Sequence, residues 1–365
     1  MLRTEWPFHG AVLNRHHGED AGGALRIVVT GQCELYGSVT VNGAPAKTAS
    51  GRFEASVTLT ERETDLAAVQ DGAYGRQEHR VRVVWDRHSF PRYRFSIDDN
   101  SFFLRDIARR QYASLFDCFY LDMLRTLNRE YGAKFTVNIY LEAQEEFGQP
   151  QFLLPDFPDR YRAEWEACAD WLGLAFHAHA NRPDRPYQYA APEQLMRELG
   201  KVEEQIARFA GEQSLVPPTV IHWGMIVPEA YRPLYDHGVR VLSGFGHPTS
   251  HGYDVNYWLD HARSEYLWNH DCLMDFASGL VFSRVDIVCN NTPIDRIAPT
   301  LEPLAADPNH AEIMDLFTHE QYFWDFYANY VPDHPQRLDA TIRWVTERGY
   351  KPVFFHEGFM GASAK

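Results

Sequence analysis

The stretch FSIDD at residues 95–99 places two adjacent carboxylates directly after a short apolar run that is typical of a buried β-strand. Two ionised carboxylates this close repel each other unless a cation or a proton lies between them. The C-terminal ends of strands are also where α/β folds usually carry their catalytic groups. A structural alternative is that Asp98, Asp99 and Asn100 only cap the next helix. The rest of the sequence has to decide between these two interpretations.

The composition bounds the class of protein. The chain has 365 residues, 45% of them hydrophobic, which suits two domains or one large barrel with an appended module. Its net charge of −15 argues against nucleic acid or an anionic membrane as a partner. No apolar run approaches the roughly 18 residues of a membrane span, and the N-terminus lacks a signal-peptide core. The sequence therefore predicts a cytoplasmic protein. A homo-oligomer is compatible with this composition, although no sequence feature indicates one.

Residues 1–90 have the pattern of a small all-β domain. Short β-branched or alternating runs, separated by Gly-rich and polar stretches, lie at 24–30, 37–41, 53–59 and 79–85. The dipeptide Asn42-Gly43 follows the second run and predicts a tight hairpin turn. No helical periodicity interrupts these runs. We therefore expect a β-sandwich domain over residues 1–90.

Residues 91–365 alternate between strands and helices. Candidate strands lie at 93–97, 135–141, 172–177, 219–223, 239–245, 280–288, 313–318 and 352–355. Apolar residues at spacings of three and four predict helices over 192–210 and 335–348, and a longer helix is expected over 106–131. Repeated strand–helix units predict an α/β domain with a parallel sheet, most simply a distorted (β/α) barrel of seven or eight strands.

Histidines and acids follow most of these candidate strands. They are Asp98, Asp99, His177, His179, His222, His247, His251, His319, Glu320, His356 and Glu357. The C-terminal strand ends of a barrel share one mouth, so these groups could meet there. Residues two apart on a strand point the same way, so His177 and His179 could reach one metal. The alternative is one buried, hydrogen-bonded His and one solvated His.

Each of the remaining candidate residues could have either a functional or a purely structural role. His319 could donate a proton to a leaving group, or it could be a surface His beyond a buried strand. Glu320 could orient His319 or face solvent. His222 could contact substrate or metal, and Trp223 could stack on a sugar or belong to the core. An Asp with two His, leaving a position for water, suits zinc or another divalent metal.

In this order, the residues resemble the polysaccharide deacetylase (NodB-homology) superfamily. The first motif of that family is Thr-Phe-Asp-Asp-Gly, and Ser-Ile-Asp-Asp-Asn stands at residues 96–100. The family has a distorted barrel and uses one divalent metal to hydrolyse N- or O-acetyl groups on carbohydrates. The resemblance implies that Asp98 is the catalytic base and Asp99 a metal ligand. The apolar strand that ends in His319 resembles the late family motif and implies that His319 is the general acid.

Two family motifs differ in this chain. The family has His-x-x-x-His, whereas here Asn181 lies four residues after His177, with His179 between them. His179, Asn181 or a distant residue such as His222 could therefore complete the metal site. The family's Arg-Pro-Pro-Tyr motif is missing, and Ile-His-Trp-Gly at 221–224 occupies its place.

The sequence thus predicts a metal-dependent carbohydrate hydrolase, most simply a deacetylase, over residues 91–365. The predicted metal ligands are Asp99, His177 and His179, the catalytic residues are Asp98 and His319, and the substrate-binding residues are His222, Trp223 and Glu320. One alternative is a metal-free glycoside hydrolase or lyase that pairs Asp98 or Asp99 with Glu320 or Glu357. Another alternative is a carbohydrate-binding protein without catalytic activity.

Overall fold

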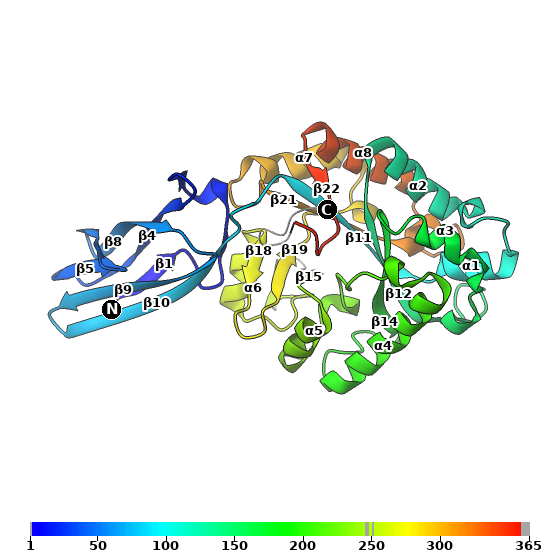
Figure 1. Ribbon diagram of the computed structural model, residues 1–365, viewed down its shortest axis with the longest axis horizontal. Coiled ribbons are helices and arrows are strands. Elements are labelled where there is room, and N and C mark those ends of the chain that lie inside the picture. The colour runs from blue at the N-terminus through cyan, green and yellow to red at the C-terminus, as the bar shows by residue number, and fades with distance from the viewer. Residues whose placement is uncertain (1, 245–247, 250–251, 359–365) are drawn as a thin grey trace. The chain divides into compact units, whose positions relative to one another are not determined.

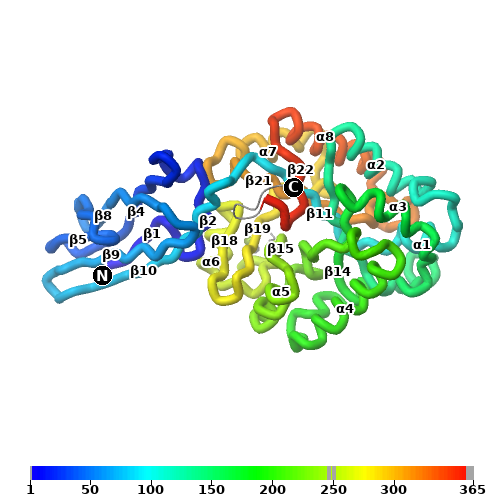
Figure 2. The backbone as a smooth tube through the Cα atoms, in the orientation of Figure 1, coloured from blue at the N-terminus to red at the C-terminus, as the bar shows by residue number. Residues whose placement is uncertain are grey.

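The computed structural model describes residues 2–244, 248–249 and 252–358. The chain forms two compact units, one built mainly from residues 2–90 with 272–276, and the other from Pro91–Asp271 with Ala277–Glu357. Figure 1 shows both units, and Figure 2 traces the backbone through them. Within the described ranges, no helix combines the length and the apolar content that a membrane span needs.

The smaller unit contains two β-sheets. The first contains β1 (Arg3–Trp6), β3 (Glu19–Asp20), β4 (Leu25–Gln32), β7 (Lys47–Ala49) and β8 (Arg52–Leu59), and the second contains β2 (Val12–Leu13), β5 (Ser38–Val41), β6 (Ala44–Pro45), β9 (Glu63–Gly72) and β10 (Gly75–Trp85). Exposed and buried residues alternate along β8, so one face of its sheet contributes to a core. The Asn42-Gly43 turn between β5 and β6 is confirmed, with positive φ angles of 49° and 81°.

The larger unit is organised around β11 (Arg92–Asn100), which pairs in parallel with three other strands. Its seven-stranded sheet also contains β12 (Phe135–Ala143), β13 (Phe152–Leu153), β14 (Leu172–Ala180), β20 (Ile287–Val288), β21 (Ile313–His319) and β22 (Lys351–Pro352). Separately, β15 (Val241–Gly244) pairs in parallel with β19 (Val281–Arg284), and β16 (Pro248–Thr249) pairs with β17 (Gly252–Tyr253). The short strand β18 (Cys272–Met274) belongs to the stretch that is grouped with the smaller unit. The fold is therefore mixed α/β with several sheets, and strand hydrogen bonds among the described residues do not close a barrel.

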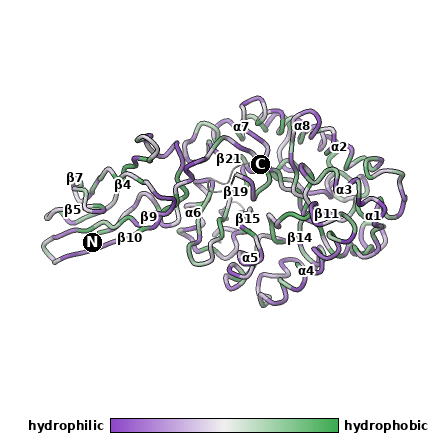
Figure 3. The backbone as a smooth tube through the Cα atoms, viewed as in Figure 1, coloured by the Kyte–Doolittle hydropathy of each residue, from purple (hydrophilic) through white to green (hydrophobic). Residues whose placement is uncertain are grey.

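Helices surround these strands (Figure 1). They are α1 (Phe102–Arg110), α2 (Phe119–Tyr131), α3 (Arg162–Glu166), α4 (Pro192–Phe209), α5 (Tyr231–His237), α6 (His261–Trp268), α7 (Ile294–Ala306) and α8 (His334–Glu347). The predictions of α4 and α8 are confirmed, and five apolar side chains of α4 form its buried stripe. Hydrophobic and hydrophilic residues alternate along this helix in Figure 3.

Four predicted elements differ from the structure, among them the strand expected over 352–355, of which β22 contains only Pro352. The helix expected over 106–131 is two helices, because Gln111 takes a left-handed conformation and ends α1. The strand expected over 219–223 is an irregular segment that ends in a 3-10 turn, where Trp223 takes a left-handed φ of 64°. The strand expected over 280–288 is divided into β19 and β20. His247 and His251 lie outside the described residues.

Candidate metal centre

Two β-bulges place the central acids and one histidine. Where β11 pairs with β12, the register shifts between Ile97 and Asn100, and Asp99 has a left-handed φ of 60°. Adjacent residues of a regular strand point to opposite faces, but a bulge re-aims one of them. Asp98 and Asp99 consequently line the same cleft. A second shift lies between β12 and β14, where His177 is the extra residue.

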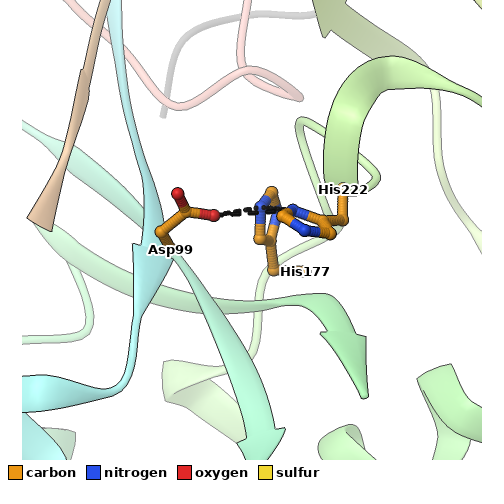
Figure 4. A group of neighbouring side chains, drawn as sticks. All are labelled: Asp99, His177 and His222. Atoms are coloured by element: carbon orange, nitrogen blue, oxygen red, sulfur yellow. Dashed lines mark hydrogen bonds and ion pairs between the residues drawn. The ribbon is translucent and has the colours of Figure 1, made fainter. Parts of the chain in front are cut away.

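Asp99, His177 and His222 form a compact group of potential ligands (Figure 4). His177 Nε2 lies 3.2 Å from Asp99 Oδ1 and 3.0 Å from His222 Nδ1. His222 Nδ1 lies 3.5 Å from Asp99 Oδ1. Ligand atoms around a tetrahedral zinc ion with ordinary bond lengths lie about 3.3 Å apart. The three atoms therefore have the spacing of ligands around one small cation.

The tautomers of the two histidines support this interpretation. His177 Nδ1 lies 2.9 Å from the carbonyl oxygen of Val220, and His222 Nε2 lies 3.1 Å from that of Asn181. A carbonyl oxygen only accepts, so these two nitrogens carry the protons of the neutral rings. The lone pairs of His177 Nε2 and His222 Nδ1 then face each other and the Asp99 carboxylate. Three converging acceptors require a cation or additional protons between them, and backbone carbonyls commonly orient metal-binding imidazoles in this way.

Tyr140 is part of this centre, although the sequence analysis did not identify it. Its hydroxyl donates a hydrogen bond to Asp99 Oδ1 and lies 3.1 Å from His222 Nδ1. Its side chain is buried on β12, close to the second bulge. The one available signal was its position at the C-terminal end of a predicted strand. Tyr140 therefore helps to hold Asp99 against the two histidines.

Asp98 has a different environment from Asp99. Its Oδ1 accepts a hydrogen bond of 2.7 Å from Asn138 Nδ2, and its Oδ2 lies 3.8 Å from His177 Nε2. Burial, with a contribution from the Asp99 charge, raises the pKa of Asp98 to about 7. Burial acts on Asp99 in the same direction, but hydrogen bonding to His177 and the nearby His319 and His222 lower its pKa below the ordinary value. The two carboxylates are thus chemically distinct.

Comparisons with known proteins were made on sequence and on structure. No protein-family model matches the sequence, and no curated protein matches it. The structure is similar to a family 4 acetyl xylan esterase from Clostridium thermocellum solved with a cobalt ion (13% identity, 75% of this chain, 93% of that chain, TM-score 0.38). It is also similar to Agd3, described as a novel carbohydrate deacetylase (10% identity, 98% of this chain, 73% of that chain, TM-score 0.39).

A distant structural similarity to a family 4 carbohydrate esterase and to a carbohydrate deacetylase accompanies the Asp-His-His group of this chain. Both similarities are distant in identity and in TM-score. We therefore derive the chemistry from the side chains of this chain.

The centre lies in a cleft of about 530 Å³. Its lining includes Asp98, Asp99, His177, Asn181, Arg182, His222, Trp223, Asn291, Phe317, His319, Gln321, Tyr322 and Tyr327. Trp223 has a left-handed φ of 64° and remains 38% exposed, and the Arg185 guanidinium lies 5.2 Å from its ring centroid. A larger cavity, of about 840 Å³, lies beside α1 and contains none of the predicted site residues.

Two predicted site residues lie apart from the Asp-His-His group. His179 is half exposed, and its Nε2 lies 3.3 Å from Glu142 Oε2. Glu320 is buried, and its carboxylate accepts hydrogen bonds from the backbone N–H groups of residues 101–103 at the start of α1. Among the described residues, the structure thus groups His222 with Asp99 and His177, and gives Glu320 a helix-capping contact.

Asp271, Asp286 and His310 form a second group of potential metal ligands. It differs from the Asp-His-His group in the nitrogen of the imidazole that carries the ring proton. His310 Nε2 lies 3.2 Å from Arg284 Nη1. A guanidinium only donates, so Nε2 is the acceptor and Nδ1 carries the ring proton. This N–H lies 3.3 Å from Asp271 Oδ1. Because a protonated nitrogen cannot bind a metal, this group is better suited to holding a proton or a buried water.

This second group makes stability depend on pH. Burial, together with the charge of Asp271, raises the pKa of Asp286 to about 8. The folded state therefore retains a proton that the unfolded chain loses at about pH 4. The stabilisation is complete below that pH and is lost as the pH rises to about 8. We expect the free energy of unfolding of Asp286→Asn, measured by urea denaturation, to rise by about 1–3 kcal/mol relative to that of wild type when the pH is raised from 5 to 9. A difference that is the same at both pH values, or that also occurs in the exposed variant Asp170→Asn, would contradict this account.

Proposed function

We propose that this protein is a metal-dependent hydrolase that removes acetyl groups from a carbohydrate. The observation that carries the proposal is the convergence of three lone pairs, from Asp99, His177 and His222, beside a second buried carboxylate in an open cleft. A single cation satisfies all three acceptors at once. Asp98 remains outside this group, 3.8 Å from His177, and is available for proton transfer.

The ligand set fits zinc or a similar divalent metal. Two imidazoles and one carboxylate form an open site of the kind found in catalytic zinc centres. A metal bound there would lower the pKa of a water molecule and polarise the substrate carbonyl. In this proposal, His222 takes the third ligand position that the sequence analysis gave to His179. Asn181 contributes through its backbone carbonyl, which orients His222.

The protein side chains would divide the proton transfers between them. Asp98 would accept a proton from the attacking water, and its raised pKa brings it close to neutral pH, where a general base works best. His319 pairs with Asp98 across β11 and β21 and lines the same cleft. It would deliver a proton from Nε2 to the leaving amine or alcohol of the sugar.

Aromatic side chains in the cleft support a carbohydrate as the substrate. Trp223, Tyr322 and Tyr327 line it together with polar groups. Exposed aromatic faces suit the apolar faces of sugar rings, and a Trp held in a left-handed conformation is an unusual residue to leave exposed without a role. Glu320 is not part of the proposed substrate site, because it caps α1.

The two glutamates named for the metal-free alternative are engaged in other contacts. Glu320 is hydrogen-bonded to the start of α1, and Glu357 accepts two hydrogen bonds from Lys134 Nζ at 2.9 and 3.0 Å. Neither is free to act opposite Asp98 or Asp99 as a glycosidase pair requires.

We further propose that residues 91–365 form an interrupted barrel with the catalytic site, and residues 1–90 an accessory β-sandwich. The barrel is supported by single backbone hydrogen bonds that connect segments between the separate sheets. Val216 N donates to Leu174 O of β14 (3.0 Å), and Ser243 N of β15 donates to Thr219 O (2.7 Å). Asp286, which lies between β19 and β20 in the sequence, donates from its backbone N–H to Asp315 O of β21 (3.0 Å).

The test is acetate release from a panel of N- and O-acetylated mono- and oligosaccharides. We expect release by the purified full chain, its loss after dialysis against a chelator, and its recovery with zinc, cobalt or manganese. Activity that survives chelation and full depletion of metal would exclude the proposed chemistry. Release of reducing ends without acetate would favour glycoside hydrolysis instead.

A further inference from the structure

Asn290 contacts the histidine that the proposed function uses as the proton donor. We propose that Asn290 is the positioning residue for His319: it fixes the proton of the neutral ring on Nδ1 and leaves Nε2 for the cleft. This inference rests on the proposed function for its catalytic meaning, but the tautomer itself can be measured without any activity. The sequence offered no signal for Asn290, which follows the short strand β20 in a 3-10 turn.

The contact defines the proton position. His319 Nδ1 lies 3.1 Å from Asn290 Oδ1, and an amide oxygen only accepts. The ring proton of neutral His319 therefore lies on Nδ1. His319 lines the cleft that contains Asp98 and Asp99, so Nε2 is the nitrogen left to exchange protons with a substrate.

The orientation of the Asn290 amide is fixed by other contacts. Its Nδ2 donates to Asn291 Oδ1 (2.8 Å), so that its Oδ1 faces His319. That oxygen also accepts from Thr318 Oγ1 (3.2 Å). The backbone carbonyl of Asn290 accepts from Arg337 Nη1 (2.9 Å), and the side chain is 4% exposed. Turning its NH2 group toward His319 would require the Asn291 amide and the Thr318 hydroxyl to turn as well.

An amide and a carboxylate would have different consequences at this position. Both hold Nδ1–H, but only a carboxylate adds a full negative charge that stabilises the imidazolium. With Asn290, a neutral His319 has its proton on Nδ1 and a lone pair at Nε2. It must take up a proton at Nε2 before it can give one to a leaving group. Asn290 therefore sets the proton position of His319 and adds no charge of its own.

Other charged groups near His319 stay the same in variants of Asn290. Asp99, His177 and His334 interact with it electrostatically. Tyr322 contacts the ring at a centroid distance of 5.9 Å. A change in the protonation of His319 on replacing Asn290 thus reports on the amide itself.

The first experiment is nitrogen NMR of the full chain labelled at its histidines, with the His319 signals assigned by their loss in His319→Gln. We expect wild type to have its His319 proton on Nδ1. Asn290→Ala should lose this preference, and Asn290→Asp should keep it and raise the pKa of His319 by about 1–3 pH units. A proton on Nε2 in wild type, or an unchanged tautomer in Asn290→Ala, would overturn the proposal.

The second experiment is kinetic. We expect Asn290→Ala to lower kcat at least about tenfold with little change in KM, and Asn290→Asp to move the alkaline limb of the pH profile upward. Asn309→Asp adds the same charge outside the cleft and should leave the profile unchanged. Thermal unfolding checks that each variant folds. If no substrate is hydrolysed, the proposed function fails while the NMR result still decides the role of Asn290.

Discussion

Replacing His222 with alanine is expected to lower the affinity for zinc by at least about 100-fold, whereas replacing His179 should leave it nearly unchanged. His222 Nδ1 lies 3.0 Å from His177 Nε2 and 3.5 Å from Asp99 Oδ1, with its proton held on the opposite nitrogen. Loss of an outer-shell partner alone typically costs 10–100-fold in affinity, so loss of a ligand should cost more. Metal content and a competition titration with a chromophoric chelator provide the measurement.

His179→Ala is the matched control, since it removes a histidine from the same strand, two residues after His177. Its imidazole is half exposed and faces Glu142. Retention of metal by His222→Ala together with its loss in His179→Ala would reverse the assignment. Equal retention by both variants would mean that these histidines do not form the centre at all.

Replacing Asp98 with asparagine is expected to lower kcat by about 10²–10⁴-fold without loss of metal. The amide is nearly the same size, and its oxygen can still accept the 2.7 Å hydrogen bond from Asn138, but it cannot take up a proton at neutral pH. The expected loss is the usual contribution of a general base. The measurement is acetate release under saturating substrate, with metal content determined on the same samples.

Asp295→Asn serves as a control for the loss of one negative charge, because Asp295 is exposed on α7. It should retain wild-type kcat. Loss of metal in Asp98→Asn would instead identify Asp98 as a ligand. Unchanged kcat with metal retained would remove Asp98 from the mechanism.

The sequence was sufficient to predict the central strand and its acids. The apolar run before Asp98 and Asp99 is buried in β11, and the helical periodicities of α4 and α8 are confirmed. These features can be predicted because regular helices and strands have periodic patterns of hydrophobic residues. His222 was one of the residues left open for the metal site, because nothing local relates it to a residue 45 positions earlier.

The irregular parts of the site could not be predicted. The expectation that His177 and His179 face the same way assumes a regular strand, but the register between β12 and β14 shifts at His177. Tyr140 and Asn290 act through contacts between elements that are far apart in the sequence. The capping contact of Glu320, which was predicted to bind substrate, could not be foreseen, because the N–H groups of α1 lie far from it in the sequence.

The two bulges also limit how this centre could be built elsewhere. In each bulge, one strand contains one more residue than the strand it pairs with, at the point where a proposed ligand projects. Copying only the side chains of Asp99 and His177 onto an ordinary parallel sheet would direct them to the wrong faces. A designer would have to insert the additional residues as well, and a deletion of one residue there would dismantle the site while every ligand remained in the sequence.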